Sequence, residues 1–261
     1  AWGYAIGAAE RGVEIHPNTE VTGILVEGGA ATGVETTRGT VRCDCVVQAV
    51  AGSSGLLAGM AGFKLPIRSV PLQACVSQPL KPFLDTIVVS GSLHVYISQS
   101  ARGELVMGGA TDPYPLYSTR STLDFMEGLM GHVLELFPFL GNLKILRQWA
   151  GIADMTPDFA PIMGVSPISN YYLDAGWGTW GFKATPVSGK RMAECVATDT
   201  QPDLLQPFRL SRFAELDFVG ERGAASVASS TGLACNIVKT SLSPGSTDLK
   251  ACRALENTGK K

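Results

Sequence analysis

Residues 176–189 constrain the fold of this chain more than any other stretch. They begin with a Gly-x-Gly-x-x-Gly pattern, which follows an apolar run at 171–175 and precedes a helical pattern expected from about Lys190 to Thr198. Glycines between a strand and a helix let the backbone approach a ligand where a side chain would clash, and a helix start offers unpaired N–H groups to anionic atoms. The stretch therefore predicts the binding site of a nucleotide or a flavin.

The same glycines also allow a nicotinamide-binding Rossmann motif, but their surroundings disfavour that alternative. A Rossmann motif opens a strand-helix-strand unit with an acidic residue about 20 positions further on, at the end of the next strand. Asp199 lies near that distance, yet it sits at a helix exit with no Val/Ile run after it. Pro186 also interrupts the place where a Rossmann helix should already run. A flavin loop is the better interpretation.

The composition excludes several classes of partner. The chain has 261 residues, of which 45% are apolar and 17% charged, so it can form one large or two small globular domains. The net charge of −2 and the scattered Lys and Arg residues give no reason to expect nucleic acid or a membrane. The 6 cysteines and 3 histidines show no metal-type spacing. We expect no metal site and buried free thiols in a reducing cytoplasm.

The order of the expected elements outlines the rest of the fold. Residues 1–11 have a helical pattern without a preceding cap, so we expect the chain to begin inside a domain. The nearly continuous apolar run at 45–50 predicts a strand buried on both faces. Residues 121–137 have a helical period that packs one face on a predominantly antiparallel sheet. Further strands are expected at 13–15, 21–27, 31–36, 40–42, 69–77, 86–90, 93–98, 104–108 and 143–149.

Four further segments accompany the glycine-rich loop in an ordered series, at 70–74, 94–100, 147–151 and 155–158. With that loop they resemble the D-amino-acid oxidase-like family of FAD-dependent oxidoreductases, and within it the beta subunits of heterotetrameric sarcosine oxidases. The likeness extends from the first residue to about Ala228. The fold that it implies is of the α+β and α/β classes: the C-terminal part of a two-domain FAD-dependent amine oxidase.

The resemblance also implies a division into domains. Residues 1–68 would form part of a Rossmann-like FAD-binding domain, and residues 149–228 its C-terminal segment. Residues 69–148 would form an antiparallel-sheet substrate domain inserted between them. Residues 229–261 are rich in Ser, Thr, Gly and Lys and resemble nothing in the family, so we expect a flexible tail.

The activity implied by the resemblance is oxidation of the N-methyl group of sarcosine by FAD, which yields glycine. The implied partners are the alpha, gamma and delta subunits of sarcosine oxidase, with a second flavin, FMN, on a histidine that is not in this chain. FAD is expected to bind without a covalent bond, because Gly151 stands where the monomeric relatives carry a cysteine. Two alternatives stay open: an oxidase or dehydrogenase of another secondary amino acid, and an inactive fragment that retains only a subunit-binding surface.

Lys183 is the strongest candidate for a catalytic and substrate-binding residue. By resemblance its ammonium lies beside the flavin and pairs with the amino-acid carboxylate, and a partly desolvated site strengthens such a pair. Without the resemblance, a solvated loop lysine is the better interpretation. Gly178 and Gly181 are expected to present N–H groups to the flavin, although turn formation accounts for them equally well. Val21 is a cofactor contact by resemblance alone.

The aromatic and hydroxyl side chains of the loop have two interpretations each. Trp177, Trp180 and Phe182 would either wall the flavin ring or belong to the core. Thr185 is expected to cap a helix that begins near Ser188.

Overall fold

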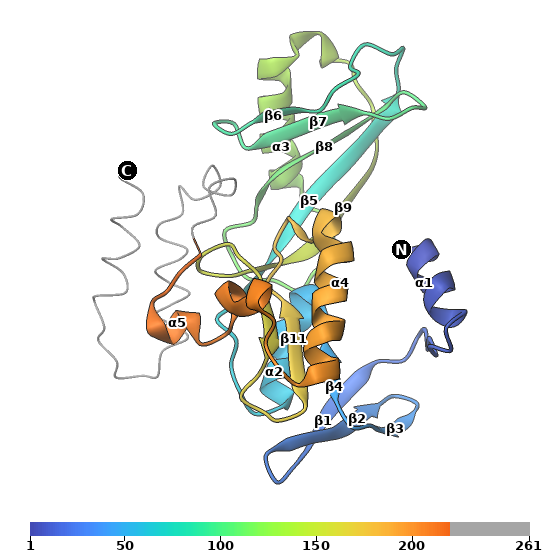
Figure 1. Cartoon of the computed structure of the whole chain (residues 1–261). Coiled ribbons are helices and arrows are strands. Elements are labelled where there is room, and N and C mark those ends of the chain that lie inside the picture. Colours follow the sequence, from blue (N-terminus) through green and yellow to red (C-terminus); the bar gives the residue numbers. More distant parts are fainter. Residues whose placement is uncertain (220–261) are drawn as a thin grey trace.

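The computed structural model describes residues 1–219 (Figure 1). It begins with helix α1 (Trp2–Ala9) and an antiparallel meander of β1 (Val21–Glu27), β2 (Ala30–Thr36) and β3 (Gly39–Arg42). Gly28 and Gly29 both have positive φ, at 59° and 83°, as a tight turn between two strands requires. The predicted helix and meander are confirmed, whereas the strand expected at 13–15 is not formed.

The second sheet carries the glycine-rich loop. Strand β4 (Val46–Gln48) lies parallel to β11 (Tyr171–Ala175), which pairs on its other side with antiparallel β10 (Ile162–Val165). Val47 is 45% exposed, so the prediction of a strand buried on both faces is wrong. The reason is that β4 is an edge strand of this sheet in the described part of the chain. Helix α2 (Ser54–Met60) follows β4, and its Ala58 joins the core between the meander and this sheet.

The third sheet is antiparallel throughout, as the sequence predicts. Its order is β6 (Val88–Ser90), β7 (Val95–Gln99), β8 (Glu104–Thr111), β5 (Arg68–Pro79) and β9 (Ile145–Met155). Helix α3 (Leu123–Leu136) is capped by Thr122, whose hydroxyl accepts the N–H of Phe125 at 3.3 Å. Its buried face packs on the sheet in a cluster that includes Met126, Leu129, Val133, Ile97, Leu105 and Met107.

Strands β5 and β9 form the longest pairing, from Arg68↔Met155 to Ser77↔Ile145. In Figure 1 these two strands extend from the end of their sheet that carries α3 toward the smaller sheet beside α4 (Gly181–Thr198). Strand β9 continues past its expected end at 149, so its last residues lie near the glycine-rich loop. The boundary predicted at 148/149 falls inside this strand, and the division into domains stays a prediction.

Helix α4 begins at Gly181, not near Ser188 or Lys190. Pro186 misled the prediction: it lies in the second turn of α4, where it removes a single backbone hydrogen bond, and the helix continues past it to Thr198. The chain continues through α5 (Arg212–Glu215). Short 3-10 helices lie at Ala51–Ser53, Pro138–Leu140 and Asp203–Phe208. The expected tail, 229–261, and the end of the segment 149–228 lie outside the described residues.

Among the helices that the structure describes, none has the length and apolar character needed to cross a membrane. The four cysteines in this part of the chain are free thiols. Cys75 and Cys195 are buried, as expected, but Cys43 is exposed.

Candidate functional site

The turn after β11 needs glycine at its first and third positions. Gly176 has φ +74° and Gly178 has φ +53°, a region that side chains rarely adopt. A Cβ on Gly176 would lie 2.5 Å from Cγ2 of Thr156, and one on Gly178 would lie 3.1 Å from Sδ of Met155. Both neighbours follow or end β9, so the glycines let the turn pack directly against that strand.

A buried carboxylate holds the same turn. Asp154, on β9, is 2% exposed; its Oδ2 accepts the N–H of Gly176 at 2.6 Å and its Oδ1 accepts the N–H of Gly178 at 3.0 Å. Burial raises the pKa of Asp154, while the N–H groups of this turn oppose that rise. The sequence signal was a single acidic residue in the apolar run 150–155, and we did not anticipate its role.

A second carboxylate ties the turn to α4. Asp174 accepts the indole N–H of Trp177 at 2.5 Å and the hydroxyl of Ser188 at 2.7 Å. Trp177 packs against the buried cluster that contains Met163 and Met192, so it belongs to the core. Phe182 differs, because it is 95% exposed.

The N-terminal end of α4 combines the positive end of the helix dipole with the cationic side chain of Lys183. In the described structure no side chain caps this end, and its first turn holds no acidic residue. Lys183 lies in that first turn and is exposed, with its Nζ 4.6 Å from the centroid of the Trp180 ring. Lys183, Trp180, Phe182 and Thr179 line a shallow depression of about 240 Å³.

Thr185 does not have its predicted role. Its Oγ1 donates to the carbonyl oxygen of Gly181 at 3.1 Å, one turn earlier in the same helix. The N-cap residue is Trp180, which makes no capping bond through its side chain in the described structure. The prediction was wrong because the helix begins before Thr185.

The start of α4 and the ammonium of Lys183 together fit one electron-rich edge of a flavin. The free N–H groups of a helix start and an ammonium favour carbonyl or carboxylate oxygens. Gly181, the first residue of α4, is placed to present such an N–H group, whereas the N–H of Gly178 already donates to Asp154. Gly151 is exposed on β9, where an added Cβ would meet no described atom within 4 Å, and it offers no nucleophile for a covalent bond.

Val21 lies at the start of β1 and is half-buried. It packs against the cluster that contains Ile24 and Tyr171. This is the place of an ordinary strand valine, and its cofactor contact stays a prediction.

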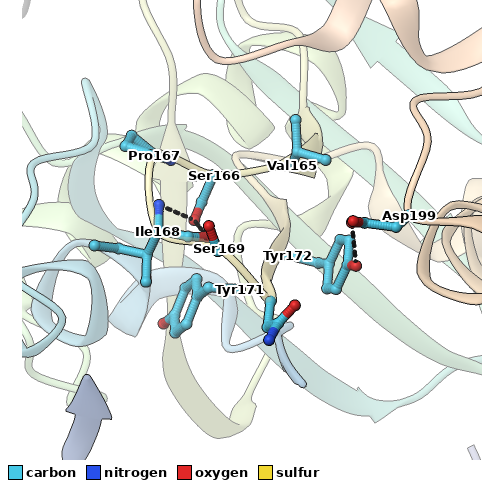
Figure 2. Close-up of a pocket in the computed structure, with 9 residues that line it drawn as sticks. Val165, Ser166, Pro167, Ile168, Ser169, Tyr171, Tyr172 and Asp199 are labelled. Carbon is cyan, nitrogen blue, oxygen red and sulfur yellow. Dashed lines mark hydrogen bonds between the residues drawn. The ribbon is translucent and has the colours of Figure 1, made fainter. Parts of the chain in front are cut away.

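A second concavity lies at the other end of β11, around the β10–β11 connection (Figure 2). Its volume is about 290 Å³, and Asp199 lies on its wall. Asp199 caps the end of α4 and accepts the hydroxyl of Tyr172 at 2.7 Å, a bond that raises the pKa of Tyr172 to about 12. Asp199 is the residue that a Rossmann motif would need to bind a ribose. It lies at a helix exit, as the sequence indicated, and it is hydrogen-bonded to Tyr172.

Comparisons with known proteins agree with this geometry. The chain is 48% identical to sarcosine oxidase subunit beta of Rhodobacter capsulatus over 87% of its length, which covers 55% of that relative. It is 47% identical to the subunit of the same name from an Arthrobacter species, again over 87% of this chain and 56% of the relative. The chain thus spans about half the length of the curated relatives that it matches.

Solved structures show the same fold. L-proline dehydrogenase from P. horikoshii superposes with a TM-score of 0.77 at 30% identity, covering 84% of this chain and 60% of that one. Glycine oxidase from Geobacillus kaustophilus gives a TM-score of 0.71 at 24% identity, over 80% of this chain and 56% of its own, and this likeness concerns the fold alone.

The family model described as "DAO: FAD dependent oxidoreductase" matches residues 1–195, a range that includes the meander, the long antiparallel sheet and the glycine-rich loop. The chain therefore belongs to the DAO family of FAD-dependent oxidoreductases.

Proposed function

We propose that this chain is the C-terminal part of a sarcosine oxidase beta subunit, which oxidises sarcosine to glycine with FAD. The observation that carries the proposal is the 48% identity to such a subunit over 87% of the chain. The glycine-rich turn and the cationic start of α4 support it, because they provide a place for an electron-rich ring edge and for a carboxylate.

Bound FAD would supply the chemistry, a two-electron oxidation of the N-methyl group to an imine that water then hydrolyses. Lys183 would bind the substrate carboxylate with its ammonium. The positive end of α4 would add to this attraction, since an anion is stabilised near a helix N-terminus. The indole of Trp180 holds the ammonium by a cation–π contact at 4.6 Å, which limits the positions that Lys183 samples before substrate arrives.

The remaining parts of the proposal concern cofactors and partners. We propose that FAD binds without a covalent bond and contacts Gly178, Gly181, Lys183 and Val21. The contact of Gly178 would not use its N–H group, which already donates to Asp154. By likeness to the named subunits, FMN would lie at a subunit interface, and alpha, gamma and delta subunits would complete a cytoplasmic heterotetramer.

A second candidate is an FAD-dependent oxidase or dehydrogenase of another secondary amino acid. The similarity to an L-proline dehydrogenase, with a TM-score of 0.77, favours it. Proline and sarcosine share a carboxylate next to a secondary amine, so Lys183 would have the same role for both. A third possibility is a fragment without activity that binds partner subunits only.

The experiment compares Lys183→Ala with Lys190→Ala in the native, FAD-loaded protein. Lys190 is also exposed and lies on the same helix, beyond its first turns. Loss of a charge-assisted hydrogen bond of about 1.5–3 kcal/mol should weaken sarcosine binding by about ten- to a hundredfold in the Lys183 variant. The Lys190 variant should match wild type, and both should keep their flavin content.

The outcomes separate the candidates. Tight binding of proline without binding of sarcosine would favour the second candidate. Wild-type protein without visible flavin absorption after FAD is supplied would favour the inactive fragment. Unchanged sarcosine affinity in Lys183→Ala would falsify the role of Lys183.

A further inference from the structure

The side chain of Asp154 holds the backbone of the glycine-rich turn from outside the turn. Two oxygens of a single carboxylate accept two alternate N–H groups of the turn, those of Gly176 and Gly178. Successive N–H groups that converge on one point form an anion-binding concavity. The anion in this concavity is therefore a side chain of the protein.

The carboxylate is deeply buried and has no cationic partner. In the described residues no lysine or arginine forms an ion pair with Asp154, and its side chain is shielded from water. A buried carboxylate is costly unless its oxygens accept hydrogen bonds, so the turn and Asp154 depend on each other. An amide at this position would present an NH₂ donor to one of the two N–H groups and lose that bond.

Asp154 also connects two parts of the fold. It lies on β9, opposite Ser69 of β5, and both strands belong to the antiparallel sheet proposed to face the substrate. The turn that it holds leads directly into α4, whose first turn carries Lys183. The side chain of Asp154 thereby links the substrate sheet to the candidate flavin edge.

We infer that Asp154 is a positioning residue: it fixes the glycine-rich turn on β9 and thereby sets where the start of α4 and Lys183 stand relative to the flavin. This inference rests on the proposed function for its consequence, but the fixing of the turn does not need FAD. The two can therefore be tested separately.

The test compares Asp154→Asn, Asp154→Glu and Val133→Ala in the native protein. Val133 is 1% exposed in the cluster under α3, so its truncation destabilises the core without touching the turn. The first measurement is amide hydrogen exchange of residues 176–183 without FAD. The second is the FAD dissociation constant together with the visible absorption spectrum of the bound flavin.

In Asp154→Asn the turn should exchange about tenfold faster or more, and FAD should bind about tenfold more weakly with altered absorption maxima. Asp154→Glu keeps both acceptor oxygens and should restore the spectrum in part. Val133→Ala should lower the melting temperature. Once amide exchange of the turn is compared with the rate of global unfolding, it should match wild type, as should the FAD affinity and the flavin spectrum.

Two results would overturn the inference. One is wild-type exchange of the turn in Asp154→Asn; the other is faster exchange with FAD affinity and spectrum unchanged. If wild-type protein binds no FAD, the proposed function fails, whereas the exchange data still decide whether Asp154 fixes the turn.

Discussion

Replacing Arg212 with methionine should destabilise this protein more than most single substitutions. Arg212 is 0% exposed, and its guanidinium donates to both oxygens of Asp158, at 2.8 Å and 3.0 Å. It also donates to the carbonyl oxygens of Ala160 at 2.9 Å and Arg209 at 3.2 Å. Methionine keeps much of the volume but leaves the buried carboxylate without its cation, a loss of about 3–5 kcal/mol.

Urea unfolding would measure this loss. With a slope of about 1–3 kcal/mol per M, the midpoint should fall by about 1–2 M or more with an unchanged slope. Arg42→Ala is the matched control, because it breaks an ion pair with Glu27 in which both side chains are 61% exposed. It should leave the midpoint close to that of wild type, since water screens such pairs.

The double variant Arg212→Met/Asp158→Asn separates the ion pair from packing. Removing the second charge should recover about 1–2 kcal/mol relative to Arg212→Met, because the carboxylate no longer lies uncompensated in the core. The reasoning would be refuted if Arg212→Met and Arg42→Ala had equal urea midpoints, or if the double variant unfolded at a lower urea concentration than Arg212→Met.

Two further predictions concern packing and thiol chemistry. Gly176→Ala should lower the free energy of unfolding, measured in urea, by about 1–3 kcal/mol, because its φ of +74° and the contact at 2.5 Å with a threonine methyl both oppose a side chain. Gly189→Ala, inside α4 with no described atom near an added Cβ, should raise the same free energy by about 0.5–1 kcal/mol. Burial raises the pKa of Cys75 to about 11, so at pH 8 it stays a protonated thiol and should react with a maleimide only after unfolding. Among the four cysteines that the structure describes, exposed Cys43 should react first, although partial burial also raises its pKa; peptide mapping that finds Cys75 labelled in folded protein would contradict this order.

Local pattern was sufficient for the antiparallel parts of the fold. Alternation of apolar residues and turn-forming glycines predicted the meander at 21–42, and a helical period predicted α3 on its sheet. Both patterns depend on residues that are neighbours in sequence, so one amino-acid sequence is sufficient to predict these elements. The parallel pairing of β4 with β11 depends on residues far apart in sequence, and pattern alone did not specify its register.

The site was predicted less completely than the fold. The glycines marked the turn because glycine adopts its positive φ values without the strain that other residues incur. Asp154 and Asp174 were missed because an isolated acidic residue in a strand has no distinctive pattern, and the donors to their carboxylates come together only once the turn is folded. Pro186 gave a misleading signal, since α4 runs through it with the loss of one backbone bond in its second turn.

The ladder between β5 and β9, which is irregular only between Val76 and Ser77, limits how the described part of the chain can bend. Residues from Arg68 to Ser77 stay paired with Met155 to Ile145, so bending between the two ends of the molecule would break many backbone bonds at once. Movements of the described part that leave this ladder intact must then take place in its connecting segments. Changes at the end that carries α3 can accordingly be made without displacing the glycine-rich turn, which Asp154 holds at the other end of the ladder.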